Sequence, residues 1–277
     1  MVNASIAEFE IVKIGDHRSD SKLDFLAVEE PLEIRLKYGE ADNRLTKNIS
    51  ITMRTPGNDA ELASGFLFTE GIISSKVDIT NISHSGFNEN VIEVSLHEDV
   101  ALDLKKIERH FYTSSSCGVC GKSSIDSVRT VIPLSTSVDD LKITAPTLLE
   151  LPQTLRKKQD VFEYTGGLHA SALFDARGNL LLSREDVGRH NALDKLIGAG
   201  LAKAIIPISN HILLLSGRAS FELIQKTAMA GIKIVAAVGA PSSLAVELAK
   251  DFNITLVGFL RDKRFNIYSG AERIIIE

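Results

Sequence analysis

Short apolar runs alternate with amphipathic stretches through the second half of the chain, and this alternation limits the fold more than any other sequence feature. The runs 212–215, 234–238 and 254–260 have the length and composition of buried strands. The stretches 221–228 and 244–252 between them carry apolar residues at helical spacing. Strands that alternate with helices form a partly parallel sheet covered on both faces. We therefore expect an α/β domain in this part of the chain.

The first half of the chain predicts smaller elements. Apolar residues occupy every second position in parts of 31–53, which is typical of strands, and residues 91–96 repeat the pattern. Residues 54–57 contain proline and glycine and end the earlier strand region. Asn58, followed by two carboxylates, favours a helix start, and Gly71 favours its end. These elements predict a small α+β domain.

A polar segment separates the two halves. Residues 113–124 are dominated by serine, glycine and cysteine, and prolines punctuate the chain after them, so we place the main domain boundary here. Residues 169–174 and 180–183 flank a turn and predict a hairpin early in the second half. The predicted division is a small α+β domain at 1–112, a cysteine loop and linker at 113–144, and the α/β domain at 145–277.

The bulk composition is that of an ordinary globular protein in water. Of the 277 residues, 44% are hydrophobic and 24% are charged, and the formal net charge is -5. This negative charge disfavours nucleic acid and anionic membranes as general partners. The N-terminus carries charged residues where a signal peptide would be apolar, and the apolar runs are too short to cross a bilayer. We therefore expect a cytoplasmic protein.

The two cysteines, Cys117 and Cys120, form a CxxC pair in a polar loop that contains glycine. In a reducing compartment such a pair indicates metal-binding, redox or nucleophilic chemistry. An accidental pair of buried thiols fits this loop poorly, because a glycine-flanked polar segment is an unfavourable place to bury sulfur. Zinc usually needs three or four protein ligands, and the seven histidines show no paired ligand spacing. No metal is therefore expected.

Two strand-to-helix turns, residues 216–220 and 239–243, form a second candidate site. Each combines small residues with backbone N–H groups at a helix N-terminus, which is a natural phosphate site, and the first also contains Arg218. In a parallel sheet such turns line the crevice at the carboxyl ends of the strands. Ordinary helix capping by the serines of these turns is the structural alternative.

A cationic segment follows the last of the apolar runs. It consists of Phe259, Leu260, Arg261, Asp262, Lys263 and Arg264. Arginine side chains suit phosphates, and an aromatic or guanidinium plane stacks on a nucleobase. A solvated turn before a further strand is the alternative. Residues 184–191 are also dense in hydrogen-bonding groups, which favours a site without fixing its role.

Four segments together resemble the FdhD family. They are Arg-Thr-Pro-Gly-Asn at 54–58, Ser-Cys-Gly-Val-Cys-Gly-Lys at 116–122, Arg-Glu-Asp-Val-Gly-Arg-His-Asn-Ala at 184–192 and Ser-Gly-Arg-Ala-Ser at 216–220. FdhD proteins are sulfur carriers required for formate dehydrogenase activity. The combination of these segments is specific in a way that no single segment is.

The resemblance implies that a cysteine desulfurase delivers sulfur as a persulfide to Cys117, with Cys120 as an assisting thiol. The sulfur would then pass to the molybdenum cofactor, bis-molybdopterin guanine dinucleotide, before this cofactor enters formate dehydrogenase. Residues 259–264 match the family segment that contacts the guanine dinucleotide. The two turns, the first of which contains Arg218, and the Arg261/Arg264 pair would anchor its pyrophosphates. A cytidine deaminase-like three-layer C-terminal domain with a mixed sheet, and a homodimer, are also implied.

The thiol chemistry agrees with this resemblance, because a Cys117 thiolate would take sulfane sulfur by the displacement used in thiol–disulfide exchange. Cys120 would then either release the sulfur, leaving a disulfide, or help to hold the chain. A zinc-dependent deaminase needs His-x-Glu followed by Pro-Cys-x-x-Cys. Here Ser171 stands where the glutamate is required, and the cysteine pair precedes His169 and lacks the proline, so a deaminase is disfavoured. A non-catalytic chaperone that only binds the cofactor stays open, because its anion-binding features would be the same.

Overall fold

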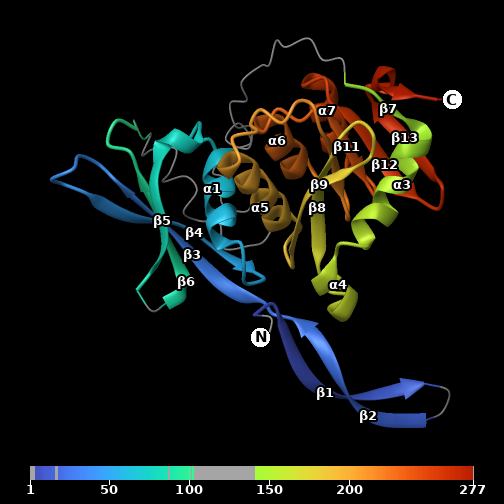
Figure 1. The fold of residues 1–277 in the computed structure, drawn as a ribbon, viewed down its shortest axis with the longest axis horizontal. Helices are drawn as coiled ribbons and strands as arrows, with labels where there is room; N and C mark the ends of the chain where they lie inside the picture. The colour runs from blue at the N-terminus through green and yellow to red at the C-terminus, as the bar shows by residue number, and fades with distance from the viewer. Residues whose placement is uncertain (1–3, 16–17, 87, 101, 103–140, 277) are drawn as a thin grey trace.

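A computed structural model of the chain describes residues 4–15, 18–86, 88–100, 102 and 141–276. The described residues form two main sheets, with helices between and around them (Figure 1). The loop that contains Cys117 and Cys120 lies outside the described residues.

The first half of the chain builds a four-stranded mixed sheet. Its strands, in spatial order, are β4 (Leu45–Arg54), β3 (Glu30–Tyr38), β6 (Asn88–Leu96) and β5 (Ile79–Ser85). β3 and β6 run parallel, whereas the outer pairs are antiparallel. Leu32, Ile34 and Leu36 of β3 are buried in a core that also contains Leu62 and Leu67 of the helix that follows β4. That helix, α1 (Asp59–Thr69), is the one that the sequence predicts after Asn58.

The second half builds a six-stranded mixed sheet. Its strands, in spatial order, are β13 (Arg264–Ser269), β12 (Thr255–Arg261), β11 (Ile234–Ala237), β10 (Ile212–Leu215), β8 (His169–Phe174) and β9 (Leu180–Asp186). The three central strands β10, β11 and β12 are parallel, because a helix crosses over between each strand and the next. The antiparallel strands β8, β9 and β13 flank them.

Helices cover both faces of this sheet (Figure 1). They are α5 (Arg189–Ala202), α6 (Phe221–Met229) and α7 (Ser243–Asp251) on one face and α3 (Ala145–Arg156) on the other. Successive strand residues point to opposite faces. Leu213 and Leu215 therefore join the core of α5, α6 and α7, whereas Ile212 and Leu214 join the core of α3.

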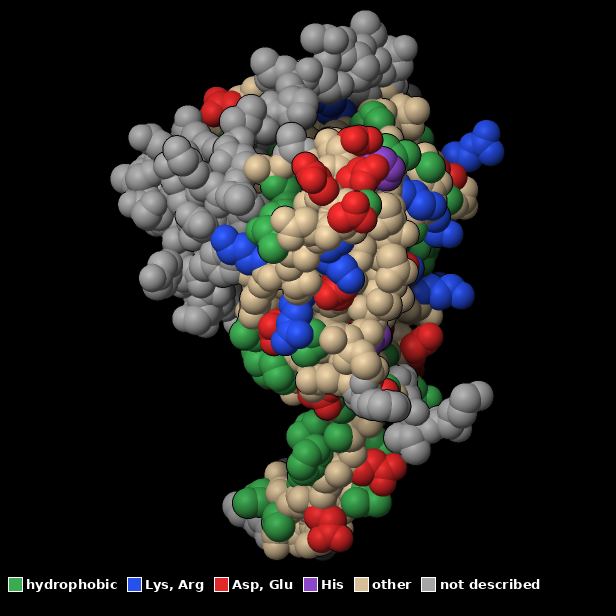
Figure 2. All heavy atoms as spheres, turned by 90° about the vertical axis from the view of Figure 1, so that its left-hand side faces the viewer, with side chains coloured by type: hydrophobic (Ala, Val, Ile, Leu, Met, Phe, Trp, Pro, Cys, Tyr) green, Lys and Arg blue, Asp and Glu red, His purple; other side chains and the backbone are tan. Residues whose placement is uncertain are grey.

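The remaining elements lie at the edges of this body. They are the antiparallel hairpin of β1 (Ile6–Gly15) and β2 (Arg18–Ala27), the helix α4 (Asp160–Thr165), the two-residue strands β7 (Ile143–Thr144) and β14 (Ile274–Ile275), and the 3-10 helices Lys76–Asp78 and Ala271–Arg273. The hairpin projects away from the body, and hydrophobic and acidic side chains are exposed along it (Figures 1 and 2). Phe25 of β2 packs edge-on against Tyr164 of α4, with 6.4 Å between the ring centroids.

The prediction of a mixed α/β protein with a mixed sheet is confirmed. The cytidine deaminase-like arrangement of the C-terminal part and the division at residues 112 and 144 stay predictions. One hydrophobic core contains side chains from both halves, such as Ile34 of β3 and Leu256 of β12, so the halves are packed against each other. No helix in the described part of the chain is long and apolar enough to cross a membrane.

Two helices from different halves, α1 and α5, cross with their backbones in contact at Gly65 and Gly198. A Cβ atom on Gly65 would lie 1.9 Å from the backbone oxygen of Asp194, and one on Gly198 would lie 1.9 Å from the backbone oxygen of Glu61. Glycine is therefore required at both positions, because only a residue without Cβ allows this approach. The crossing joins the helix of the first sheet directly to a helix that covers the second.

A buried ion pair lies beside this crossing. The Nζ atom of Lys226 on α6 is 2.9 Å from a carboxylate oxygen of Asp194 and also donates to the hydroxyl of Thr69 at 2.8 Å. Burial lowers the pKa of Lys226, but the carboxylates of Asp194 and Glu70 raise it above its ordinary value of 10.5. A raised pKa means that the folded protein holds this proton more tightly than the unfolded chain does. The stability that the shift contributes is therefore complete at pH values below the ordinary pKa of 10.5, and it is lost as the pH rises through the folded-state pKa.

Lys226→Met is expected to lower the free energy of unfolding by about 3–5 kcal/mol, because Asp194 would keep a buried charge without its partner. Thermal unfolding followed by circular dichroism measures the loss. The matched control is Lys226→Met with Asp194→Asn, which removes both charges and is expected to recover part of the stability. Equal stability of Lys226→Met and the unaltered protein would contradict the prediction.

Candidate functional site

The turns after the parallel strands lie together at one edge of the six-stranded sheet. Gly239 donates its N–H to the carbonyl of Gly217 at 2.9 Å, and Ala219 donates to the carbonyl of Ala240 at 3.2 Å. Ser242 donates its N–H back to the carbonyl of Ala219 at 3.0 Å. The two predicted turns thus hydrogen-bond to each other. The sequence suggests that their N–H groups are available to a phosphate, but these three already donate to backbone carbonyls. The Ser242 side chain caps the N-terminus of α7, which agrees with the alternative that the serines of these turns are ordinary helix caps.

The next strand end carries an unusual backbone. Phe259 adopts a left-handed conformation, with φ of 55°, where the register between β12 and β13 shifts, and its N–H donates to the carbonyl of Gly239 at 3.0 Å. Asp262 and Lys263 are also left-handed and form the two-residue turn between Arg261 and Arg264. Left-handed aromatic residues are rare and concentrate at functional sites.

A cavity of about 860 Å³ opens at this edge, between the β12–β13 turn and the helices α3 and α4. Arg261, Asp262 and Lys263 line one wall, and the cofactor-binding role of 259–264 stays a prediction. Arg156 of α3 and Phe162 of α4 line the other, with the guanidinium carbon 4.1 Å from the ring centroid. This stacked pair is a cation–π contact and presents a flat, charged surface to the cavity.

Other residues of the predicted cofactor segment lie outside the cavity lining. Leu260 is completely buried in the core beside α3, so only its backbone is available to a ligand. Phe259 is half-buried, with the guanidinium carbon of Arg261 5.9 Å from its ring centroid. Arg264 and Arg218 are exposed. Arg261 and Lys263 therefore line the same cavity as Arg156, whereas Arg218 and Arg264 are not among its lining residues.

His169 lines the floor of the cavity at the start of β8. Burial lowers the pKa of His169, and electrostatic interactions with Arg189 and His190 lower it further, whereas Asp186 opposes them. A Cβ atom on Gly217 would lie 3.2 Å from the Nδ1 atom of His169, so the turn after β10 packs closely on the ring. The imidazole is therefore neutral at neutral pH and offers one donor and one acceptor.

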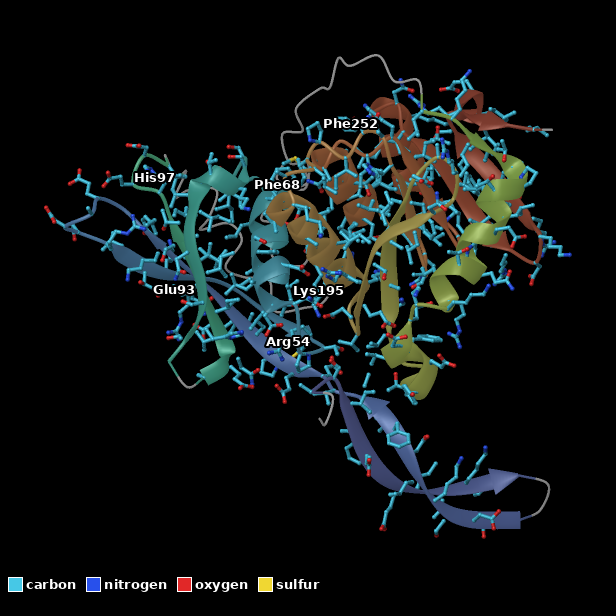
Figure 3. All side chains as sticks on the ribbon, in the orientation of Figure 1. Arg54, Phe68, Glu93, His97, Lys195 and Phe252 are labelled. Carbon is cyan, nitrogen blue, oxygen red and sulfur yellow. The ribbon has the colours of Figure 1, made fainter. Side chains whose placement is uncertain are left out.

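The segments around residues 55 and 186 form a joint beside His169. The buried carboxylate of Asp186 lies 2.7 Å from the Nζ atom of Lys195 and accepts the N–H of Thr55 at 3.2 Å. Lys195 also donates to the carbonyl of Thr55 at 2.8 Å. Figure 3 shows Lys195 and Arg54 where the four-stranded sheet meets α5. Because Asp186 pairs with His169 across β8 and β9, this joint fixes the strand end that carries His169.

His190 takes part in a separate polar cluster. Its Nε2 atom is 3.5 Å from the hydroxyl of Ser220 and 3.9 Å from a carboxylate oxygen of Glu222. Burial acts to raise the pKa of Glu222, but hydrogen bonds from His190, its own backbone N–H and Ser220 lower it to about 2. Both contacts use the same ring nitrogen, so this cluster is not the nucleophile–base–carboxylate relay of hydrolases.

The described residues contain no group of three or more histidine, cysteine, aspartate or glutamate side chains with metal-site geometry. The predicted catalytic residues, Cys117 and Cys120, lie outside the described part of the chain, so their roles stay predictions. Sequence reasoning missed Arg156, Phe162 and His169 as cavity residues.

The fold defines a mixed α/β protein with a cavity at the carboxyl edge of its sheet, lined by more cationic than acidic side chains. Residues 27–275 match the model of the FdhD/NarQ family. The chain belongs to this family.

Curated relatives agree with this assignment. A protein of Mycolicibacterium paratuberculosis named sulfur carrier protein FdhD is 52% identical over 256 residues, which cover 90% of this chain and 91% of that protein. A protein of the same name from Saccharolobus solfataricus is 42% identical over a match that covers 97% of this chain and 98% of that protein. A crystal structure from Desulfotalea psychrophila, described as a formate dehydrogenase accessory protein, matches the fold with a TM-score of 0.73 at 24% identity, over 98% of this chain and 99% of that one.

Proposed function

We propose that this chain is a sulfur carrier that accepts persulfide sulfur from a cysteine desulfurase and transfers it to bis-molybdopterin guanine dinucleotide for formate dehydrogenase. The names of the relatives support the sulfur-carrier role. The cationic cavity is the observation that supports a nucleotide-bearing acceptor. The proposal places the protein in the cytoplasm, where thiols stay reduced, and includes a homodimer.

The cavity has the chemistry that a guanine nucleotide requires. Arg156, Arg261 and Lys263 supply three positive charges for phosphate oxygens, against the two carboxylates of Glu150 and Asp262. The stacked surface of Arg156 and Phe162 suits a flat base. Its volume lies within the range of about 300–1,000 Å³ that encloses small ligands, so it suits one nucleotide arm of the cofactor.

Sulfur transfer follows from thiol chemistry. The Cys117 thiolate attacks the outer sulfur of the donor's persulfide, a new S–S bond forms, and the donor's cysteine leaves as a thiolate. The Cys120 thiolate then attacks the sulfur atom of Cys117 and breaks this bond. The outer sulfur leaves as sulfide with the electron pair, and the two cysteines are left as a disulfide that a cellular thiol reduces.

Arg261→Ala and Lys263→Ala are each expected to weaken GDP binding by roughly fivefold to tenfold, because each removes a cation from the cavity wall. Isothermal titration calorimetry with GDP measures the dissociation constant. Arg177→Ala is the matched control, since Arg177 is an exposed arginine in the turn between β8 and β9, away from the cavity lining. Unchanged affinity in both cavity variants would remove these residues from the nucleotide site.

A further inference from the structure

The hairpin of β1 and β2 has surfaces that its own chain leaves uncovered. Phe9, Val12, Ile14 and Leu23 are exposed, and no third strand within the described residues pairs with either edge. A two-stranded hairpin alone is marginally stable in water, and an open edge readily adds another strand. The family match begins at residue 27, so all of the hairpin except its last residue, Ala27, lies before the matched region.

Strand β2 carries a charge pattern that is complementary to itself in an antiparallel pair. Asp20 and Lys22 are both exposed, and they flank the exposed Ser21. Alternate residues of a strand share a face, so the two charges lie on one face and Ser21 lies on the other. Within the hairpin, Asp20 pairs with Lys13. Lys22 pairs with Ile11, so it has no carboxylate directly opposite it.

We propose that two copies of this chain join through their β2 strands, antiparallel and centred on Ser21, in one four-stranded sheet. This register places Asp20 opposite Lys22 of the partner subunit, and Lys22 opposite Asp20 of the partner subunit. The twofold axis therefore creates two pairs of opposite charges across the interface. The apolar side chains of Val12 and Ile14 from both copies then lie on a single face of the joined sheet. This interface rests on the homodimer of the proposed function and specifies it.

Other pairings of the hairpin fit less well. A parallel pairing of two β2 strands in register would place Asp20 beside its own copy, which is repulsive. Strand β1 carries Glu8 and Glu10 but only Lys13, so pairing through β1 leaves a glutamate without an opposite charge. The charges of β2 therefore favour antiparallel pairing with the β2 strand of a second copy of this chain.

Charge reversal in the full-length chain tests this surface. Asp20→Lys and Lys22→Asp each convert two attractive pairs into repulsive ones, and each is expected to weaken dimerisation by about tenfold in sedimentation equilibrium. An equimolar mixture of the two variants restores opposite charges at both pairs, so its heterodimer is expected to regain the original affinity. Damage to the hairpin within one chain would not be repaired by mixing.

A second measurement locates the axis. Directly opposed Cα atoms in antiparallel strands lie about 4.5–5.5 Å apart, within the range that a disulfide spans. Ser21→Cys in a Cys117→Ser, Cys120→Ser background is therefore expected to form a covalent dimer under mild oxidation. The proposal is overturned if the unaltered chain is monomeric, if single reversals leave the dimer intact, or if mixing restores nothing. These outcomes concern assembly alone and are separate from persulfide loading and GDP binding.

Discussion

Cys117→Ala is expected to abolish persulfide formation on this chain. After incubation with a cysteine desulfurase and cysteine, the unaltered protein should gain about 32 Da per sulfur atom in mass spectrometry, and the variant should gain nothing. The reason is that the thiolate is the nucleophile, and alanine has no group that accepts sulfur. Formate dehydrogenase activated with the variant should be correspondingly inactive.

Cys120→Ala is the matched control for this result. It keeps the thiol proposed to accept sulfur and removes the thiol proposed to release it, so the adduct should persist and accumulate. Treatment with a reductant should then return the mass to its starting value in both the control and the unaltered protein. An adduct that survives in Cys117→Ala would show that another residue carries the sulfur.

Gly198→Ala is expected to cost about 4 kcal/mol or more of unfolding free energy, or to prevent folding altogether. The new methyl group would overlap the backbone oxygen of Glu61, which lies 1.9 Å from the Cβ position. Backbone atoms cannot swing aside as a side chain can, so α1 and α5 would have to separate. Urea unfolding followed by circular dichroism, together with the soluble yield, measures the effect.

Gly200→Ala is the control on the same helix. A Cβ atom there would meet only side-chain atoms, the nearest being Cδ1 of Ile208 at 3.1 Å, and alanine favours helix over glycine by about 1 kcal/mol. Its stability should therefore stay close to that of the unaltered protein. Similar stability in the two variants would show that the helix crossing adjusts easily.

The sequence predicts the second half of the fold well, because buried strands and amphipathic helices leave strong periodic signals. The strand expected at 212–215 is β10, and the hairpin expected at 169–183 is β8 and β9. Helix α3 was missed because prolines indicate breaks, yet Pro146 occupies its first turn and Pro152 lies inside it. Leu148, Leu151 and Leu155 recur at helical spacing and carry the signal that identifies this helix.

The sequence indicates the residues of only one wall of the cavity. A run of cations after a strand indicates Arg261 and Lys263, but nothing local indicates that Arg156 of α3 faces them across the cavity. The same holds for the joint of Thr55, Asp186 and Lys195, whose members come from distant segments. Side chains that meet through tertiary packing leave no periodic pattern, so sequence spacing identifies the segments and not their contacts.

The parallel pair of β7 and β14 has a consequence for the order in which contacts form while the chain is synthesised. Ile143, soon after the cysteine-bearing segment, pairs with Ile274 near the far end of the chain. Domains begin to fold while the ribosome is still extending the chain. Ile143 gains its strand partner only after residues 274–275 have been synthesised, so this pair forms after the strands and helices between the two segments have been made.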